Sequence, residues 1–150
     1  MLEVLGMKLT EADVRMVNEG VPAELKVNLS IDNITKHDEF NVVLSYTYVV
    51  NYLPDMAVVT VRGIAFCRDT KENISTLLEA WRKKREIPEN LGGAAVNMIN
   101  ANTAVNTLFL IRPFNLVPHF MPPPVYVEGP PPKGAGPKAK AKAKPKKKKR

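Results

Sequence analysis

The sequence predicts an α+β protein: an antiparallel sheet of about four strands, then two helices and a basic tail. Three observations support this prediction. Apolar and polar residues alternate through the first half, the spacing becomes helical at Asp69, and prolines and then lysines dominate after Arg112. The chain has 150 residues, enough for one hydrophobic core. We expect a folded domain over residues 1–128 and a Pro- and Lys-rich tail over residues 129–150.

The first two predicted strands are recognised by their period of two. Residues 3–17 contain the alternating apolar side chains of Leu5, Met7 and Leu9. In residues 23–31 every second residue is apolar and the others are polar, which is typical of a strand with one buried and one solvated face.

The third and fourth strands are predicted to form a hairpin. Residues 40–53 are rich in β-branched and aromatic residues, and apolar side chains from Phe40 to Val50 share one parity. A turn containing Pro54 leads into residues 56–67. The odd-numbered positions of this last strand are small residues, so we expect another element to approach that face closely.

Two helices are predicted after the sheet. The segment Asp69–Glu72 has the pattern of a capping box, in which we expect the Asp69 side chain to accept from the first turn and Glu72 to reach back. Apolar residues then recur at helical spacing, and the four bases of residues 82–85 suit the end of the helix dipole. A second, long helix is predicted over residues 89–111, whose small residues allow close packing on the sheet or on a partner helix.

The positive charge of the chain is concentrated in its last 18 residues. The whole chain has 22 Lys and Arg against 15 Asp and Glu, but ten of the bases and none of the acids lie in Lys133–Arg150, so residues 1–132 carry 12 bases against 15 acids. The candidate nucleic-acid-binding residues are Lys133, Lys138, Lys140, Lys142, Lys144, Lys146, Lys147, Lys148, Lys149 and Arg150.

Prolines and like-charge repulsion predict that this tail is a disordered, extended arm when it is free. It has no aromatic or planar polar side chain that could read bases, so its contacts would be to phosphate and independent of sequence. A compact domain with a lysine-rich arm resembles ribosomal proteins, and this resemblance favours ribosomal RNA as the partner. DNA binding and a purely solubilising tail are the alternatives.

Several other classes of function are poorly supported. The single cysteine, Cys67, excludes an internal disulfide framework and a multi-cysteine zinc site, and we interpret it as a core residue. The polar residues His37, Asp38 and Glu39 are interpreted as a solvated turn, and His119 has no evident partner. We therefore expect no enzymatic activity, cofactor or metal. With neither a secretion signal nor a long apolar stretch, the sequence predicts a cytoplasmic protein without membrane insertion.

The segment from Asn90 to Met121 resembles the SecB export-chaperone family. The matching run is "LFLIRPFNLVPHFM", in which the residues that carry the resemblance are Leu110, Ile111, Pro113, Phe114, Asn115, Leu116, Phe120 and Met121. The resemblance implies a Greek-key sheet, oligomerisation through sheet and helix, and hydrophobic grooves for non-native polypeptide. The chain departs from the family after this run, where "PPPVYVEGPPP" replaces a second helix.

Aromatic residues around the helices provide the candidates for such a groove: Trp81, Phe109, Phe114 and Phe120. Each has the alternative interpretation of an ordinary core residue. Two hypotheses follow. In the first, a SecB-like, non-enzymatic protein associates with the ribosome through its tail, as a ribosomal component or a chaperone for emerging chains. In the second, a free homo-oligomeric holdase acts in protein export and the tail gives only solubility.

Overall fold

The computed structural model describes residues 1–119. It contains four strands, β1 (Glu3–Met16), β2 (Glu24–Lys36), β3 (Asn41–Leu53) and β4 (Ala57–Arg68). Two α-helices, α1 (Lys71–Lys84) and α2 (Glu89–Ile111), and one 3-10 turn, η1 (Arg112–Phe114), follow the strands. An antiparallel sheet followed by two helices confirms the predicted α+β class. The end of the predicted domain, Phe120 and the whole basic tail lie outside the described residues.

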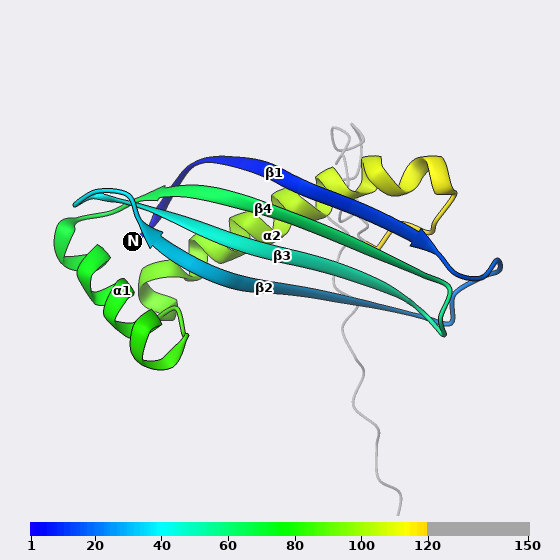
Figure 1. Ribbon diagram of the computed structural model, residues 1–150, viewed down its shortest axis with the longest axis horizontal. Coiled ribbons are helices and arrows are strands. Elements are labelled where there is room, and N and C mark those ends of the chain that lie inside the picture. The colour runs from blue at the N-terminus through cyan, green and yellow to red at the C-terminus, as the bar shows by residue number, and fades with distance from the viewer. Residues whose placement is uncertain (120–150) are drawn as a thin grey trace, which may run out of the picture.

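The four strands form one antiparallel sheet in the order β1-β4-β3-β2. Short turns join β2 to β3 and β3 to β4, which confirms the predicted hairpin. The chain between β1 and β2 instead passes from one edge of the sheet to the other (Figure 1). Strands β1 and β2 are therefore the two edges, and the pairing register of each shifts along its length.

Both helices cover the same face of the sheet (Figure 1). In β3, every second residue from Val42 to Tyr52 is buried, and those between are only partly covered. Helix α1 and the first half of α2 pack over one end of the sheet, around Leu44 and Tyr46. The second half of α2 packs over the other end, around Tyr48 and Val50. None of the helices in residues 1–119 lies on the opposite face of the sheet, and we call it the open face.

A glycine at the centre of β4 leaves room for the Tyr46 ring, which comes from the neighbouring strand β3. A Cβ atom at Gly63 would lie 2.6 Å from Cζ of Tyr46 and 2.8 Å from the carbonyl oxygen of Lys8. Both distances are too short for carbon, so only glycine fits beside the Tyr46 ring. Burial raises the pKa of Tyr46, while the neighbouring Thr103 hydroxyl acts in the opposite direction.

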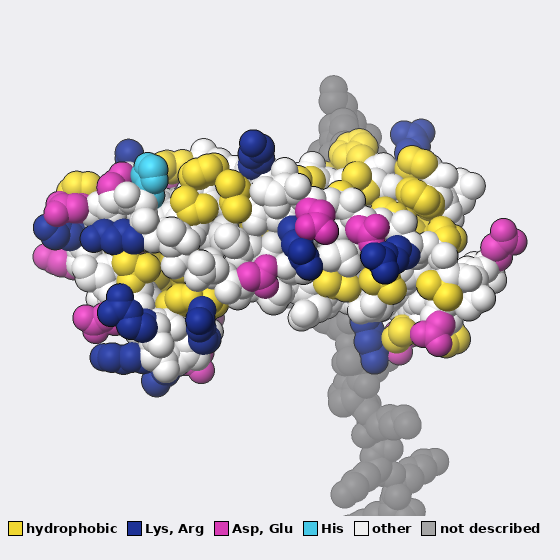
Figure 2. Space-filling model, viewed as in Figure 1, with side chains coloured by type: hydrophobic (Ala, Val, Ile, Leu, Met, Phe, Trp, Pro, Cys, Tyr) yellow, Lys and Arg dark blue, Asp and Glu magenta, His cyan; other side chains and the backbone are white. Residues whose placement is uncertain are grey.

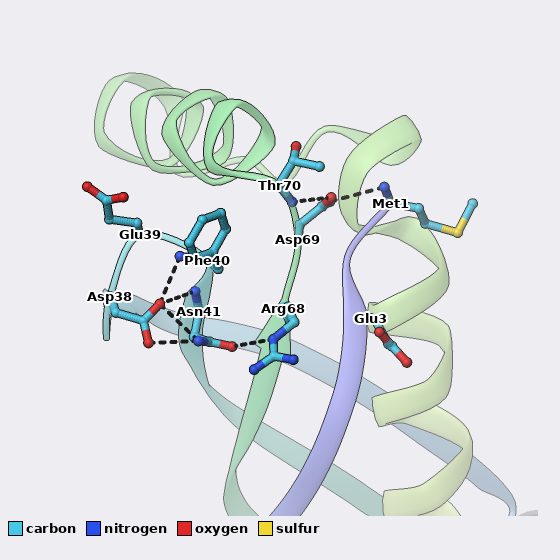
Figure 3. A pocket seen from close by; sticks show the side chains of 9 residues that line it. All are labelled: Met1, Glu3, Asp38, Glu39, Phe40, Asn41, Arg68, Asp69 and Thr70. Carbon is cyan, nitrogen blue, oxygen red and sulfur yellow. Dashed lines mark hydrogen bonds and ion pairs between the residues drawn. The ribbon is translucent and has the colours of Figure 1, made fainter.

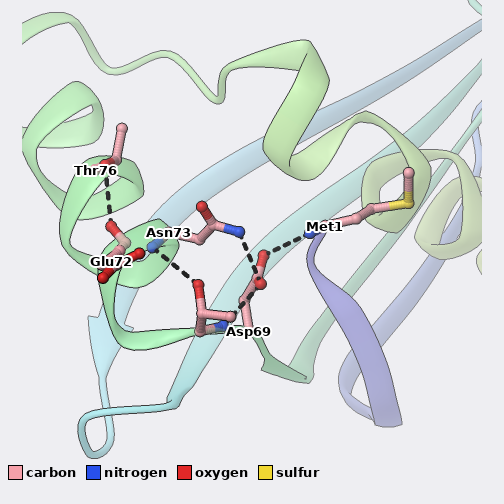
Figure 4. A network of polar contacts seen from close by, with 6 residues as sticks. Met1, Asp69, Glu72, Asn73 and Thr76 are labelled. Atoms are coloured by element: carbon pink, nitrogen blue, oxygen red, sulfur yellow. Dashed lines mark hydrogen bonds and ion pairs between the residues drawn. The ribbon is translucent and has the colours of Figure 1, made fainter.

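The predicted capping box of α1 is wrong by one residue (Figure 4). The N-cap is Thr70, whose Oγ1 accepts a hydrogen bond from the backbone N–H of Asn73 at 3.4 Å. The Asp69 carboxylate instead accepts from the Thr70 N–H at 2.7 Å and the Asn73 side chain at 2.9 Å, and it lies 3.0 Å from the amino group of Met1. Asp69 directly follows β4, so the strand directs its carboxylate to the chain's amino group rather than to the first turn.

The chain after α2 returns to the sheet. The Tyr52 hydroxyl donates a hydrogen bond to the Val117 carbonyl oxygen at 2.8 Å, and the His119 ring lies 5.8 Å from the ring of Tyr48. Burial lowers the pKa of His119. Within residues 1–119, no helix combines the length and apolar character that crossing a membrane would require.

Candidate functional site

The structure does not bring the predicted aromatic residues together. Trp81, in α1, is buried at 8 % exposure, and the Arg85 guanidinium carbon lies 5.3 Å from its ring centroid. Phe109 and Phe114 are 69 % and 42 % exposed. Trp81 lies beside the start of α2, whereas Phe109 and Phe114 lie at its other end, roughly 25 Å away at 1.5 Å per residue (Figure 1). These residues therefore do not line a single groove.

A different apolar surface lies at one end of the open face of the sheet. We call it the sheet-end surface and define it by Leu5, Val43 and Phe66; Phe40, in the turn before β3, lines the neighbouring cleft at the end of the sheet. On β4, Phe66 has Val43 of β3 on one side and Gly6 of β1 on the other. Because Gly6 has no side chain, the Phe66 ring is left 43 % exposed, and Leu5 and Phe40 are each 51 % exposed. Figure 2 shows apolar side chains gathered toward both ends of this face, one of which is the end that carries the turn between β2 and β3.

Two neighbouring clefts lie at this end of the sheet, and the smaller one is part of the sheet-end surface. The larger, of about 720 Å³, is lined by Met1 and Glu3, by the turn Asp38–Asn41 and by residues 68–70 (Figure 3). The smaller, of about 230 Å³, lies among Leu5, Val43 and Phe66 and the same turn. Asp38 and Asn41 line both clefts, so the two are neighbours on either side of this turn.

The turn between β2 and β3 is held rigid by Asp38 (Figure 3). Its Oδ1 atom accepts hydrogen bonds from the backbone N–H groups of Phe40 and Asn41, both at 2.8 Å, and the Asn41 amide donates to both carboxylate oxygens. The Arg68 Nε donates to Asn41 Oδ1 at 3.1 Å. The Asn41 side chain, followed by the Phe40 N–H, holds the pKa of Asp38 below its usual value. The predicted turn is confirmed, and its hydrogen bonds fix the backbone that presents Phe40.

Charged groups of both signs surround the sheet-end surface. Lys71 Nζ lies 2.9 Å from a Glu39 carboxylate oxygen, and the Met1 amino group lies 3.0 Å from Asp69. Burial opposes ionisation of the Asp69 carboxyl, but hydrogen bonds from Asn73 and Thr70 and the nearby ammonium group outweigh it, and its pKa is lowered. Apolar side chains enclosed by fixed charges suit binding of a segment that carries both apolar and charged residues.

Cys67 lies on the helix-covered face of β4, in the hydrophobic core. The Cys67 side chain is fully buried, which confirms its interpretation as a core residue, and burial raises its pKa to about 11. Its thiol is therefore neutral and inaccessible. No group of three or more His, Cys, Asp or Glu among residues 1–119 is arranged to hold a metal ion.

Sequence reasoning missed the sheet-end surface. Phe40 shares the parity of the buried residues of β3, but it is exposed because β3 begins only at Asn41. One signal in the sequence could have indicated it. In β4 the small, buried residues occupy odd-numbered positions, whereas the large Phe66 occupies an even-numbered position and therefore points to the opposite face. Comparisons of the sequence with protein-family models, and of the chain with curated proteins and solved structures, found no match.

Proposed function

We propose that the chain is a SecB-like, non-enzymatic protein that binds non-native polypeptide through its folded body and associates with the ribosome through its lysine-rich tail. The observation that carries this proposal is the succession of four antiparallel strands and two helices. Its strand order, β1-β4-β3-β2, has the first strand beside the last of three hairpin-connected strands, which is the order of a Greek key. This supports the fold that the resemblance to SecB implies.

The sheet-end surface supports polypeptide binding by the body. Exposed apolar side chains that gather at one place on a protein surface are typical of interaction sites. The open face presents Phe66 and Leu5 beside the smaller cleft, and no helix of the described part of the chain covers them. An extended client segment would place apolar side chains in the smaller cleft and its charged residues against Arg68 or Glu3 in the larger one.

The charge distribution supports the ribosomal association. Ten positive charges in 18 residues, attached to a body with 15 acids and 12 bases, form an arm for polyanions rather than a basic binding face. If about ten phosphates were contacted, the logarithm of the affinity would fall with the logarithm of salt concentration at a slope of about −7 to −9. A free holdase with a solubilising tail is the second candidate, and DNA is the alternative polyanion.

Suppression of client aggregation tests the function of the body. A chemically unfolded client is diluted into buffer with the full-length protein, and light scattering is followed. We expect suppression at low molar ratio, and we expect Phe66→Gln to weaken it several-fold. Thr60→Gln is the matched control, because Thr60 lies on the same strand and face, away from the clefts. No suppression by the intact protein would rule out the chaperone proposal.

A further inference from the structure

A cleft of about 400 Å³ lies where the two helices meet the β2 edge of the sheet. It is enclosed by β2, the end of α1 and the start of α2. The client surface proposed above lies on the open face, so it does not include this cleft. The lining residues are the apolar Ile31, Trp81, Ile87 and Val96, together with Gly93 and the exposed Arg85, Glu89 and Asn97.

Helix α2 leaves a row of apolar side chains on β2 only partly covered. It packs mainly on β1 and β4, toward the other edge of the sheet. We call Leu25, Val27, Leu29 and Ile31 the β2 row; each pairs with a buried residue of β3 and therefore points to the helix-covered face. None of the four is fully buried, and Val27 is 43 % exposed. The last residue of the row, Ile31, is also a wall of the cleft.

The chain after η1 turns back toward the sheet and runs along the β2 row (Figure 1). The Val117 carbonyl oxygen accepts from the Tyr52 hydroxyl, and the His119 ring lies beside Tyr48. Tyr52 pairs with the first residue of the row and Tyr48 with the third. Ile31 pairs with the next residue on the same face of β3, about 7 Å farther along. Residues 117 and 119 therefore mark a line that leads to the cleft.

The next residues of the chain suit an apolar cleft. Residues 120–127 are FMPPPVYV and carry no charge, and Glu128 and the basic tail follow them. Three consecutive prolines favour an extended backbone, which has little conformational entropy to lose on binding. At about 3.1 Å per residue, eight such residues span about 25 Å, enough to reach Ile31 and cross the cleft.

We propose that residues 120–127 bind in the cleft of the same chain, with the Phe120 side chain between Ile31 and Trp81. The position of His119 favours this occupant over another polypeptide, because the chain itself holds residue 120 beside the cleft at a high effective concentration. The bound segment would close the cleft to other polypeptides, and the basic tail would begin beside the end of α1. The proposal goes beyond the proposed function and does not depend on client or ribosome binding.

Photo-cross-linking in the full-length protein tests this contact. Phe120 is replaced by benzoylphenylalanine, dilute protein is irradiated, and the linked peptides are identified by mass spectrometry. We expect links within one chain to Ile31 or Trp81. Asn97→Arg should lower their yield roughly fivefold or more, because it puts a larger, charged side chain into the cleft. Asn100→Arg, exposed on the same helix but outside the cleft, is the matched control and should not change the yield. Links scattered over the surface, links only between copies, or equal effects of the two variants would overturn the proposal.

The fluorescence of Trp81, the only tryptophan of the chain, provides a second readout. Phe120→Ser should increase quenching of Trp81 by acrylamide, because the ring that covers the cleft is removed. Phe109→Ser is the matched control, since Phe109 lies near the other end of α2 and its loss should leave the quenching unchanged. Circular dichroism checks that both variants are folded. Equal quenching of the original protein and Phe120→Ser would show that Phe120 does not occupy the cleft.

Discussion

Replacing each predicted aromatic residue by alanine should separate a core residue from surface residues. Trp81 is 8 % exposed and packs in the cluster that includes Leu77 and Ile99, whereas Phe109 is 69 % exposed. We expect Trp81→Ala to lower the free energy of unfolding by about 3–5 kcal/mol, the usual cost of removing a large buried aromatic side chain. Phe109→Ala should cost about 0.5–1 kcal/mol, because only about a third of the 1.5–3 kcal/mol for full burial applies.

Urea denaturation followed by circular dichroism measures these differences, with protein kept dilute so that association does not contribute. Trp81→Phe is the control, since it retains an aromatic ring and removes an indole N–H that has no acceptor within the described residues. Its cost should stay below about 1.5 kcal/mol. If Trp81→Ala costs no more than Phe109→Ala, Trp81 is not a core residue and the assignment of the two roles is wrong.

Four further predictions concern the sheet and the start of α1. Gly63→Ala should lower the free energy of unfolding by about 1–3 kcal/mol or more in urea denaturation, because its Cβ would overlap the Tyr46 ring; an unchanged midpoint would contradict the close approach. Cys67 should not react with a thiol reagent at pH 8 until the protein unfolds, and stability should fall as the pH rises from about 8.5 toward its folded-state pKa of about 11. This alkaline loss should be absent in Cys67→Ala. Thr70→Ala should lower the free energy of unfolding in urea by about 1 kcal/mol, because the N-cap hydrogen bond to Asn73 is lost. Because the pKa of Asp69 is lowered, its ionised carboxylate contributes to the free energy of unfolding above about pH 3.9, and this contribution is lost as the pH falls below that value. In Asp69→Asn, the free energy of unfolding should therefore fall less steeply with decreasing pH in this range.

Much of the secondary structure could be predicted because its signals are local. The period of two in residues 23–31 and the run of residues 89–111 identified β2 and α2, and the latter agrees with the observed bounds. The cap of α1 was misplaced because Asp69 and Thr70 are both good N-cap residues. The choice between them depends on the Met1 amino group, which the fold brings to Asp69 from the far end of the sequence.

The candidate site was harder to predict because it depends on which strands are neighbours. Periodicity showed that Phe66 lies opposite the small residues of its strand, but not that Gly6 of β1 would lie beside it. That contact exists only because β1 pairs with β4 instead of β2. The aromatic residues chosen from the sequence all lie in or just after the two helices. In the structure, however, Trp81 packs near the start of α2 and Phe109 lies near its end, so the length of α2 separates them.

Co-sedimentation with ribosomes over a salt series tests most directly the claim that the tail directs this protein to ribosomal RNA. The full-length chain is compared with a chain that ends at Glu128, and a full-length variant with Lys146 to Lys149 replaced by glutamine serves as the matched control. We expect the full-length protein to bind at low salt with a steep negative slope, the truncated chain not to bind, and the glutamine variant to have a slope smaller by about 3–4. Equal binding with and without the tail, or binding that is insensitive to salt, would contradict the account.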